Sequence, residues 1–213
     1  MEQTDRKTAE YLLQIKAIKL QPAKPFTWAS GWKSPIYCDN RMTLSFPEVR
    51  TYIRDSFAAR VKEIYPSAEL IAGVATGAVA HGALVADILG LPFIYVRSGV
   101  KDHGLGNQIE GYFDKGQEVV VIEDLISTGG SSLGAVKALR EAGCEVLGMI
   151  AIFTYGFQKA VDAFIAEKCR LDTLSNYEVL VDIALSSGYI SHVEVETLKK
   201  WRIDPSAWGK RES

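Results

Sequence analysis

Apolar and polar residues follow one another along this chain in the pattern of an α/β protein. Short apolar runs rich in Val and Ile are separated by longer segments whose apolar residues recur every three or four positions. The short runs predict strands buried on both faces of a parallel sheet, and the longer segments predict amphipathic helices. We expect strands at residues 69–74, 92–96, 119–122 and 146–153, and helices at 4–19, 47–65, 78–89, 131–142 and 157–168.

The alternation of single strands with single helices also predicts how the chain is organised. Such connections imply right-handed crossovers and a mostly parallel sheet with ligands at the carboxyl ends of its strands. We expect one domain over residues 1–213, with an α/β core at about 47–175. An irregular, aromatic-rich segment at about 20–45 precedes the core. Residues from about 176 to 213 predict two further helices, with packing or oligomer contacts as their default role.

Composition and charge exclude several classes of protein. The chain carries a net charge of −2, which argues against a nucleic-acid or membrane-surface partner. No apolar run approaches the ~20 residues that a membrane-spanning helix needs, and the N-terminus lacks the apolar core of a signal peptide. The cysteines, Cys38, Cys144 and Cys169, are odd in number and far apart. We therefore expect free thiols and a cytoplasmic location.

The most informative stretch is residues 119–132, VVVIEDLISTGGSS. An apolar strand leads to the carboxylates of Glu123 and Asp124, and a turn of small and hydroxyl residues then opens a helix. The helix N-terminus offers free N–H groups and a positive dipole end to a phosphate, and the carboxylates can accept hydrogen bonds from ribose hydroxyls. A Gly/Ser/Thr turn by itself is as often a simple helix cap, but the full order is more specific. It predicts a site for a phosphorylated sugar.

A second polar segment, VRSGVKDHGLGNQIEG at residues 96–111, lies between two apolar runs. It is too long and irregular for a tight turn, so we expect a mobile functional loop with glycine hinges. Arg97, Lys101 and His103 are three potential cationic donors within it. The alternative is an exposed basic loop without a role.

A third segment, residues 73–77, joins a predicted strand to a predicted helix. Its N–H groups can form a nest for a second anionic group, although a plain strand–helix turn is an equal alternative. Gly73, Gly77 and Gly82 lack the GxGxxG spacing, which disfavours a dinucleotide-binding Rossmann dehydrogenase.

These motifs resemble those of a known family. Residues 119–132 are similar to the 5-phosphoribosyl-1-pyrophosphate (PRPP) signature of the type I phosphoribosyltransferases. Arg97 and residues 101–104 match the Arg-x-x-x-Lys-Asp-His-Gly loop of the orotate phosphoribosyltransferases. Residues 26–37 are similar to the hood of that family, a flap that closes over the pyrimidine. The ordered resemblance covers roughly residues 26–180.

The resemblance implies a fold and an activity. The fold is the α/β type I phosphoribosyltransferase fold, a mostly parallel central sheet flanked by helices, with a small N-terminal hood. The activity is transfer of the phosphoribosyl group from PRPP to orotate, giving orotidine 5′-phosphate and pyrophosphate in pyrimidine biosynthesis. Mg²⁺ is implied as cofactor, held mainly by PRPP and water with no direct protein ligand. A homodimer that shares the catalytic loop across its interface is implied as well.

The resemblance also assigns roles to individual residues. The residues expected to be catalytic are Lys101, His103 and Asp124. Those expected to bind PRPP are Arg97, Lys101, His103, Glu123, Asp124, Leu125, Ile126, Ser127, Thr128, Gly129, Gly130, Ser131, Thr76 and Gly77. Those expected to bind orotate are Ser127, Lys33, Ser34 and Arg41.

The chain departs from the family pattern at two positions. Ser98 stands where some members have Lys, and Tyr155 stands where they have an Arg that helps to bind the orotate carboxylate. We expect Lys33, Arg41 or backbone amides to replace that Arg. Two alternatives stay open. One is a phosphoribosyltransferase for another base, which would not share the Lys-Asp-His-Gly loop. The other is a PRPP-sensing regulator without catalysis, although no basic nucleic-acid-binding element is visible.

Overall fold

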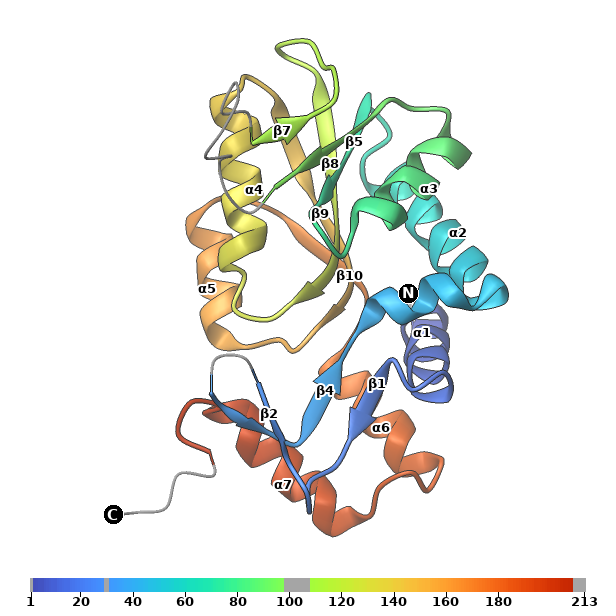
Figure 1. Ribbon diagram of the computed structural model, residues 1–213, viewed down its shortest axis with the longest axis vertical. Coiled ribbons are helices and arrows are strands. Elements are labelled where there is room, and N and C mark those ends of the chain that lie inside the picture. Colours follow the sequence, from blue (N-terminus) through green and yellow to red (C-terminus); the bar gives the residue numbers. More distant parts are fainter. Residues whose placement is uncertain (1, 29–30, 98–107, 209–213) are drawn as a thin grey trace.

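The computed structural model describes residues 2–28, 31–97 and 108–208. Its centre is a six-stranded sheet with the order β10-β9-β8-β5-β6-β7 (Figure 1). The strands are β5 (Leu70–Val74), β6 (Phe93–Val96), β7 (Ile109–Glu110), β8 (Glu118–Ile126), β9 (Glu145–Thr154) and β10 (Leu171–Asn176). Neighbouring strands are parallel except for the antiparallel pair β6 and β7. The prediction of a mostly parallel sheet is confirmed.

The sheet is buried on both faces, as the apolar runs predict. In β8, Val120 and Ile122 face one core while Val119 and Val121 face the other, and none of the four is exposed. The helices over the first core include α1 (Glu2–Gln14), α2 (Pro47–Ile64) and α3 (Val79–Leu89). The helices over the second core, on the opposite side of the sheet in Figure 1, are α4 (Gly130–Glu141) and α5 (Gln158–Ala166).

A smaller unit lies beside the central sheet at one end of the molecule (Figure 1). We call residues 18–45 the hood. Its elements are β1 (Ile18–Leu20), β2 (Phe26–Thr27), β3 (Lys33–Ser34), β4 (Ile36–Cys38) and the 3₁₀ helix η1 (Asn40–Ser45). Strand β1 pairs with β4 and β2 pairs with β3, both antiparallel. The C-terminal helices α6 (Tyr177–Ser186) and α7 (His192–Ile203) lie at the same end.

The N-terminal helix is shorter than its apolar spacing predicts. A helix was expected over residues 4–19, but α1 ends at Gln14. Lys16 has a positive φ of 58°, which stops the helix, and Ile18 then begins a strand that pairs with Cys38. Ile18, near the end of this segment, therefore belongs to a strand, because pairing within the hood overrides the local helical spacing.

Two features of the sheet also differ from expectation. Strand β8 was expected to end at Ile122, but it continues through the acid pair to Ile126, paired with β9. The edge strand β10 was not predicted, because its sequence LDTLSN has no apolar run. It is held by pairing with β9 and by packing against α1. Within the described residues, no helix is long and apolar enough to cross a membrane.

Candidate active site

The strand order places two loops side by side at the carboxyl ends of the sheet. From β5 the chain continues to β6 on one side, and from β8 it continues to β9 on the other. In α/β sheets, ligands bind in the crevice at such a switch point. The loop after β5 contains Gly77, and the end of β8 carries Asp124. A Cβ at Gly77 would fall on the Asp124 carboxylate, closer than 3.0 Å. The segments at residues 73–77 and 119–132 are therefore in contact.

Glu123 is buried inside this junction, with 4% of its surface exposed. Its Oε2 accepts a hydrogen bond from Ser132 Oγ at 2.8 Å, and its Oε1 accepts one from the backbone N–H of Asp124 at 2.9 Å. Burial, reinforced by the Asp124 carboxylate, raises the pKa of Glu123 to about 8. Burial therefore favours the protonated form of this side chain in the unliganded protein, which limits the negative charge buried here.

Asp124 lies beside Glu123 and is tied to the hood. Burial raises the pKa of its carboxyl above the ordinary value, while a hydrogen bond with Glu123 and the positive charge of Arg41 oppose the rise. The backbone carbonyl of Asp124 accepts a hydrogen bond from Asn40 Nδ2 at 2.6 Å. The Asn40 side chain accepts one in turn from the Cys38 thiol at 3.2 Å. The buried amide of Asn40 thus couples the hood to the acid pair.

A buried chain of hydrogen bonds extends from Asn40 to helix α3. Thr43 Oγ1 donates to the backbone oxygen of Asn40 at 2.6 Å and lies 3.2 Å from His81 Nε2. Because the hydroxyl hydrogen is used by Asn40, His81 Nε2 must carry the hydrogen that Thr43 accepts. Burial lowers the pKa of His81 to about 4, so the ring is neutral. Helix α3 and η1 are therefore held together behind the site.

The turn after β8 offers backbone N–H groups. Gly129 precedes α4 with a φ of 82°, a left-handed conformation that favours glycine. Within the described residues, the N–H groups of Thr128 and Gly129 have no backbone acceptor, and the first turn of any helix leaves N–H groups free. This is the arrangement that binds phosphate at a helix N-terminus.

A pocket of about 290 Å³ adjoins the acid pair on the hood side. The residues that line it are Thr27, Trp28, Tyr37, Cys38, Leu125, Ser127 and Tyr155. The hood and the end of β9 supply aromatic walls, and the β8 segment supplies the side next to the turn. Aromatic walls with a few hydroxyl groups suit a flat, polar-edged ring. We call this cavity the base pocket.

Comparison with known proteins agrees with this geometry. Residues 46–187 match the family described as phosphoribosyl transferase domain. The chain is 59% identical over 208 residues to the orotate phosphoribosyltransferase of Bacteroides fragilis, with 98% of each chain covered. The chain belongs to the orotate phosphoribosyltransferase family. This confirms the resemblance that the motifs indicate.

Solved structures of this family share the fold. The orotate phosphoribosyltransferase of Aeropyrum pernix superposes with a TM-score of 0.75 at 26% identity, covering 86% of this chain and 99% of that one. The Mycobacterium tuberculosis enzyme in complex with PRPP superposes with a TM-score of 0.66 at 24% identity, covering 85% of this chain and 99% of that one.

Two of the residues expected to bind orotate lie at the base pocket or beside it. Ser127 lines the pocket. Lys33 Nζ donates a hydrogen bond at 2.7 Å to Oγ1 of Thr27, which is itself a lining residue. Lys33 is therefore placed next to the pocket, on the β3 side of the hood hairpin.

The other two expected orotate ligands are engaged within the hood. Ser34 is fully buried, and its hydroxyl donates to the backbone oxygen of Ile36 at 2.8 Å. Arg41 forms a two-pronged ion pair with Asp39, with Nε–Oδ1 at 2.7 Å and Nη2–Oδ2 at 3.0 Å. Neither is among the residues that line the pocket in the described structure, and Arg41 would have to leave Asp39 to reach a ligand.

Sequence reasoning missed most of the aromatic lining. Trp28 and Tyr37 belong to the hood segment, where the expected orotate ligands included no aromatic residue, and Tyr155 was noted only as a position without Arg. Cys38 was noted only as a free thiol; burial raises its pKa well above the ordinary value, so it stays protonated and donates to Asn40. The aromatic richness of residues 26–37 was the available signal.

The second motif is described only at its edges. Arg97 follows β6, and its Nη1 lies 3.6 Å from Glu110 Oε1 on the neighbouring strand. Gln108 Nε2 also donates to the backbone oxygen of Arg97 at 2.8 Å. Lys101 and His103, together with Ser98, lie outside the described residues.

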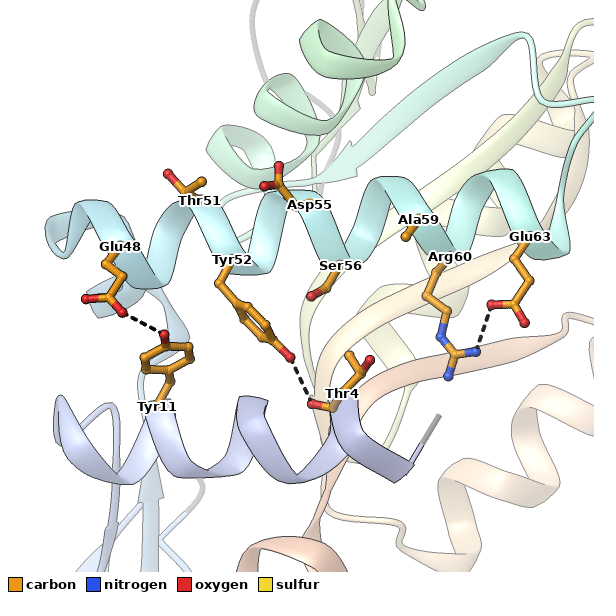
Figure 2. Close-up of a pocket in the computed structure, with 10 residues that line it drawn as sticks. All are labelled: Thr4, Tyr11, Glu48, Thr51, Tyr52, Asp55, Ser56, Ala59, Arg60 and Glu63. Carbon is orange, nitrogen blue, oxygen red and sulfur yellow. Dashed lines mark hydrogen bonds and ion pairs between the residues drawn. The ribbon is translucent and has the colours of Figure 1, made fainter.

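A larger groove lies away from the strand ends. It has a volume of about 550 Å³ and is lined only by residues of α1 and α2 (Figure 2). Across it, Tyr11 of α1 donates a hydrogen bond to Glu48 of α2 at 2.8 Å, and along α2 Arg60 pairs with Glu63. None of the motif residues contributes to this groove. Cavity size alone therefore does not mark the functional site.

Proposed function

We propose that this protein transfers the 5-phosphoribosyl group of PRPP to orotate, releasing pyrophosphate and forming orotidine 5′-phosphate in de novo pyrimidine biosynthesis. The observation that carries the proposal is the continuity of the site. Leu125 and Ser127 line the base pocket and belong to the same strand and turn as the acid pair. A flat base in the pocket and a ribose phosphate on the turn would therefore lie end to end.

The reaction exchanges one bond at the anomeric carbon of the ribose. The bond from C1′ to the pyrophosphate oxygen breaks, and its electron pair leaves with pyrophosphate. The deprotonated ring nitrogen of orotate then supplies the electron pair of the new C1′–N bond on the opposite face. Orotate has an ionisable ring nitrogen, so a strong protein base is not required. Catalysis falls to positioning and electrostatics.

Each part of the site has a proposed role in that reaction. Asp124 and Glu123 hold the ribose hydroxyls, and the Asp124 charge favours the cationic ribosyl group. The turn from Ser127 to Ser131 holds the 5-phosphate. The N–H groups of Thr76 and Gly77 face the pyrophosphate; within the described residues neither has a backbone acceptor. Loop residues Arg97, Lys101 and His103 stabilise the leaving group.

Mg²⁺ is the proposed cofactor. In the described parts of the chain, no group of three His, Cys, Asp or Glu side chains could hold a metal ion. The carboxylates that are present, Asp124 and a Glu123 already bonded to Ser132, fit an ion carried on PRPP oxygens and water. Bound there, Mg²⁺ would neutralise charge on the departing pyrophosphate.

We propose two further properties that follow from family resemblance. The first is a homodimer in which the loop at residues 98–107 reaches the neighbouring active site. The second is a cytoplasmic location, in keeping with three cysteines that form no disulfide.

A spectrophotometric assay with orotate, PRPP and Mg²⁺ tests the proposal. We expect turnover with orotate and rejection of uracil by several powers of ten, since a pocket that pairs with a carboxylate leaves donors unpaired when uracil enters. Turnover of uracil or a purine as readily as orotate would overturn the base assignment. Binding of PRPP without any turnover would favour the regulator alternative.

A further inference from the structure

Helix α7 packs against the back of the base pocket. Its Trp201 is fully buried, and the centre of its ring lies 5.6 Å from that of Trp28 and 5.7 Å from that of Tyr155. Both contacts are edge-to-face, at 84° and 83°, the geometry that aromatic pairs favour. Trp28 and Tyr155 contact each other at 5.4 Å, and both line the pocket. Trp201 is thus the shared support of two wall residues.

Two further aromatic side chains contact Trp201. Phe157 and Tyr177 lie 5.4 Å and 5.7 Å from its ring centre, and Phe157 stacks on Tyr155 at 5.3 Å. Within the described residues, the indole N–H of Trp201 has no hydrogen-bond partner. Ring packing alone therefore holds this side chain, and its position depends on the fit of its neighbours.

Arg202, the next residue of α7, forms hydrogen bonds with the backbone at Tyr155 and Gly156. Its Nε donates to the carbonyl oxygen of Tyr155 at 3.1 Å, and its Nη2 donates to that of Gly156 at 3.3 Å. Its Nη1 binds Glu178 Oε1 on α6 at 2.6 Å. A planar guanidinium can make these three contacts at once, which an ammonium group cannot reproduce. The segment after β9 is therefore pinned to α7 and α6.

The hood and α7 both lie outside the part of the chain that matches the phosphoribosyl transferase domain family. The family match covers residues 46–187, so it includes Tyr155 but neither the hood nor α7. Figure 1 shows α7 beside the hood strand β2, at the end of the molecule away from α4. The matched domain supplies the acid pair and the turn before α4, and the hood and α7 contact each other behind the base pocket through Trp28 and Trp201.

We propose that α7 is a positioning element for the base. Trp201 and Arg202 set the width of the pocket through Trp28 and Tyr155, without touching the base themselves. This inference rests on the proposed function, because it takes the pocket as the orotate site. It assigns the C-terminal helix α7 a part in base recognition, where the sequence indicated packing or oligomer contacts.

The test compares the effect of each substitution on the KM for orotate with its effect on the KM for PRPP. Arg202→Met keeps much of the side-chain volume and removes all three hydrogen bonds. A misplacement of about 1 Å can cost about 10²-fold, so partial release of Tyr155 should raise the KM for orotate about tenfold. The KM for PRPP should stay within about twofold. Arg202→Lys keeps a positive charge on one flexible ammonium group. Its KM for orotate should lie between those of the wild type and Arg202→Met.

Lys200→Met is the matched control, because Lys200 is an exposed neighbour on the same helix. It should leave both KM values unchanged. Calorimetry measures binding without turnover. Arg202→Met should weaken the binding of orotidine 5′-phosphate about tenfold and leave the binding of ribose 5-phosphate unchanged. Trp201→Phe, which keeps a buried ring, should act in the same direction and serves as the second variant if Arg202→Met does not fold.

Equal changes for both substrates in Arg202→Met would overturn the inference, since α7 would then act on the whole fold. An unchanged orotate KM in a folded Arg202→Met or Trp201→Phe protein would overturn it as well, as would an equal effect of Lys200→Met. Failure of the proposed function looks different, because the wild-type protein itself would then neither turn over orotate nor bind orotidine 5′-phosphate.

Discussion

Replacement of Gly77 by Ala tests the contact between the loop after β5 and the acid pair. The backbone at Gly77 has no positive φ, so alanine can adopt its conformation. Space is the obstacle, because the new Cβ would lie closer than 3.0 Å to the carboxyl carbon and both oxygens of Asp124. We expect the variant to fold with Asp124 displaced from its present position.

The size of the effect follows from the overlap. Carbon atoms pack best at about 3.5–4.0 Å, so the carboxylate or the loop must move by roughly 1 Å. A displacement of that size in a catalytic group can cost about 10²-fold in rate. Overpacking of this kind typically costs about 1–3 kcal/mol of stability, which corresponds to a Tm lower by roughly 2–4 °C per kcal/mol in a chain of this length.

The assay measures kcat, both KM values and Tm for Gly77→Ala and a matched control. Gly134→Ala makes the same chemical change inside α4, where a Cβ meets nothing within 4 Å. Because alanine favours a helix by about 1 kcal/mol over glycine, the control should keep its turnover and gain slightly in Tm. A loss of about 10² in kcat confined to Gly77→Ala is the expected result.

Repeating Gly77→Ala in a protein that lacks the Asp124 carboxylate identifies the group that the new Cβ overlaps. Asp124→Ala removes the carboxylate, so Gly77→Ala should cost little stability in that background, with a coupling of about 1–3 kcal/mol between the two sites. Turnover of Gly77→Ala within twofold of wild type would refute the reasoning. An equal loss of stability in both backgrounds would show that the clash lies with another group.

Three further outcomes are expected. The folded-state pKa of Glu123 is raised from 4.5 to about 8, so the folded protein holds a proton that the unfolded chain has lost between these values. Stability of the unliganded protein should therefore fall as the pH rises from about 4.5 to 8, by at most ~1.4 kcal/mol per pH unit from this group, and Glu123→Gln should flatten that slope in urea denaturation. Asn40→Leu should cost about 1–3 kcal/mol, because the carbonyl of Asp124 is left unpaired, and should raise the KM for PRPP; a wild-type Tm and KM would contradict the role of the hood amide. Lys101→Ala should lose about 10²–10³ in kcat while binding orotidine 5′-phosphate almost normally, and mixing it with Asp124→Asn subunits should restore activity; mixtures that never exceed their parents despite subunit exchange would place the loop in its own active site.

The central strands could be predicted because they are buried on both faces. Residues 119–122 are all fully buried, and such a position tolerates only apolar side chains, so the composition of the segment reveals its environment. The location of the site follows from the same reasoning. Once the strands are parallel, the segments that end them must share one edge of the sheet, and the contact between Gly77 and Asp124 is the consequence.

Elements held by non-local pairing could not be predicted in this way. Strand β10 contains Asp172, Thr173, Ser175 and Asn176, and it is a strand because β9 offers it a free edge. The end of α1 is set by the pairing of β1 with β4, almost twenty residues further along the chain. In both cases the local sequence favours another conformation or none, and the partner strand decides.

The two halves of the site differ in the same respect. The half proposed for the phosphoribosyl group is built from backbone N–H groups and an acid pair that are contiguous in sequence, so a short motif is sufficient to describe it. The base half is built from side chains that come together only in the folded chain: Trp28, Tyr155 and Trp201 lie in three separate segments. Each of them, taken alone, has the pattern of an ordinary core aromatic, since ring packing and pocket lining select the same residue types. The proposed ribose site can therefore be predicted from the sequence of this chain, whereas the proposed base pocket depends on how the hood and α7 pack against one another.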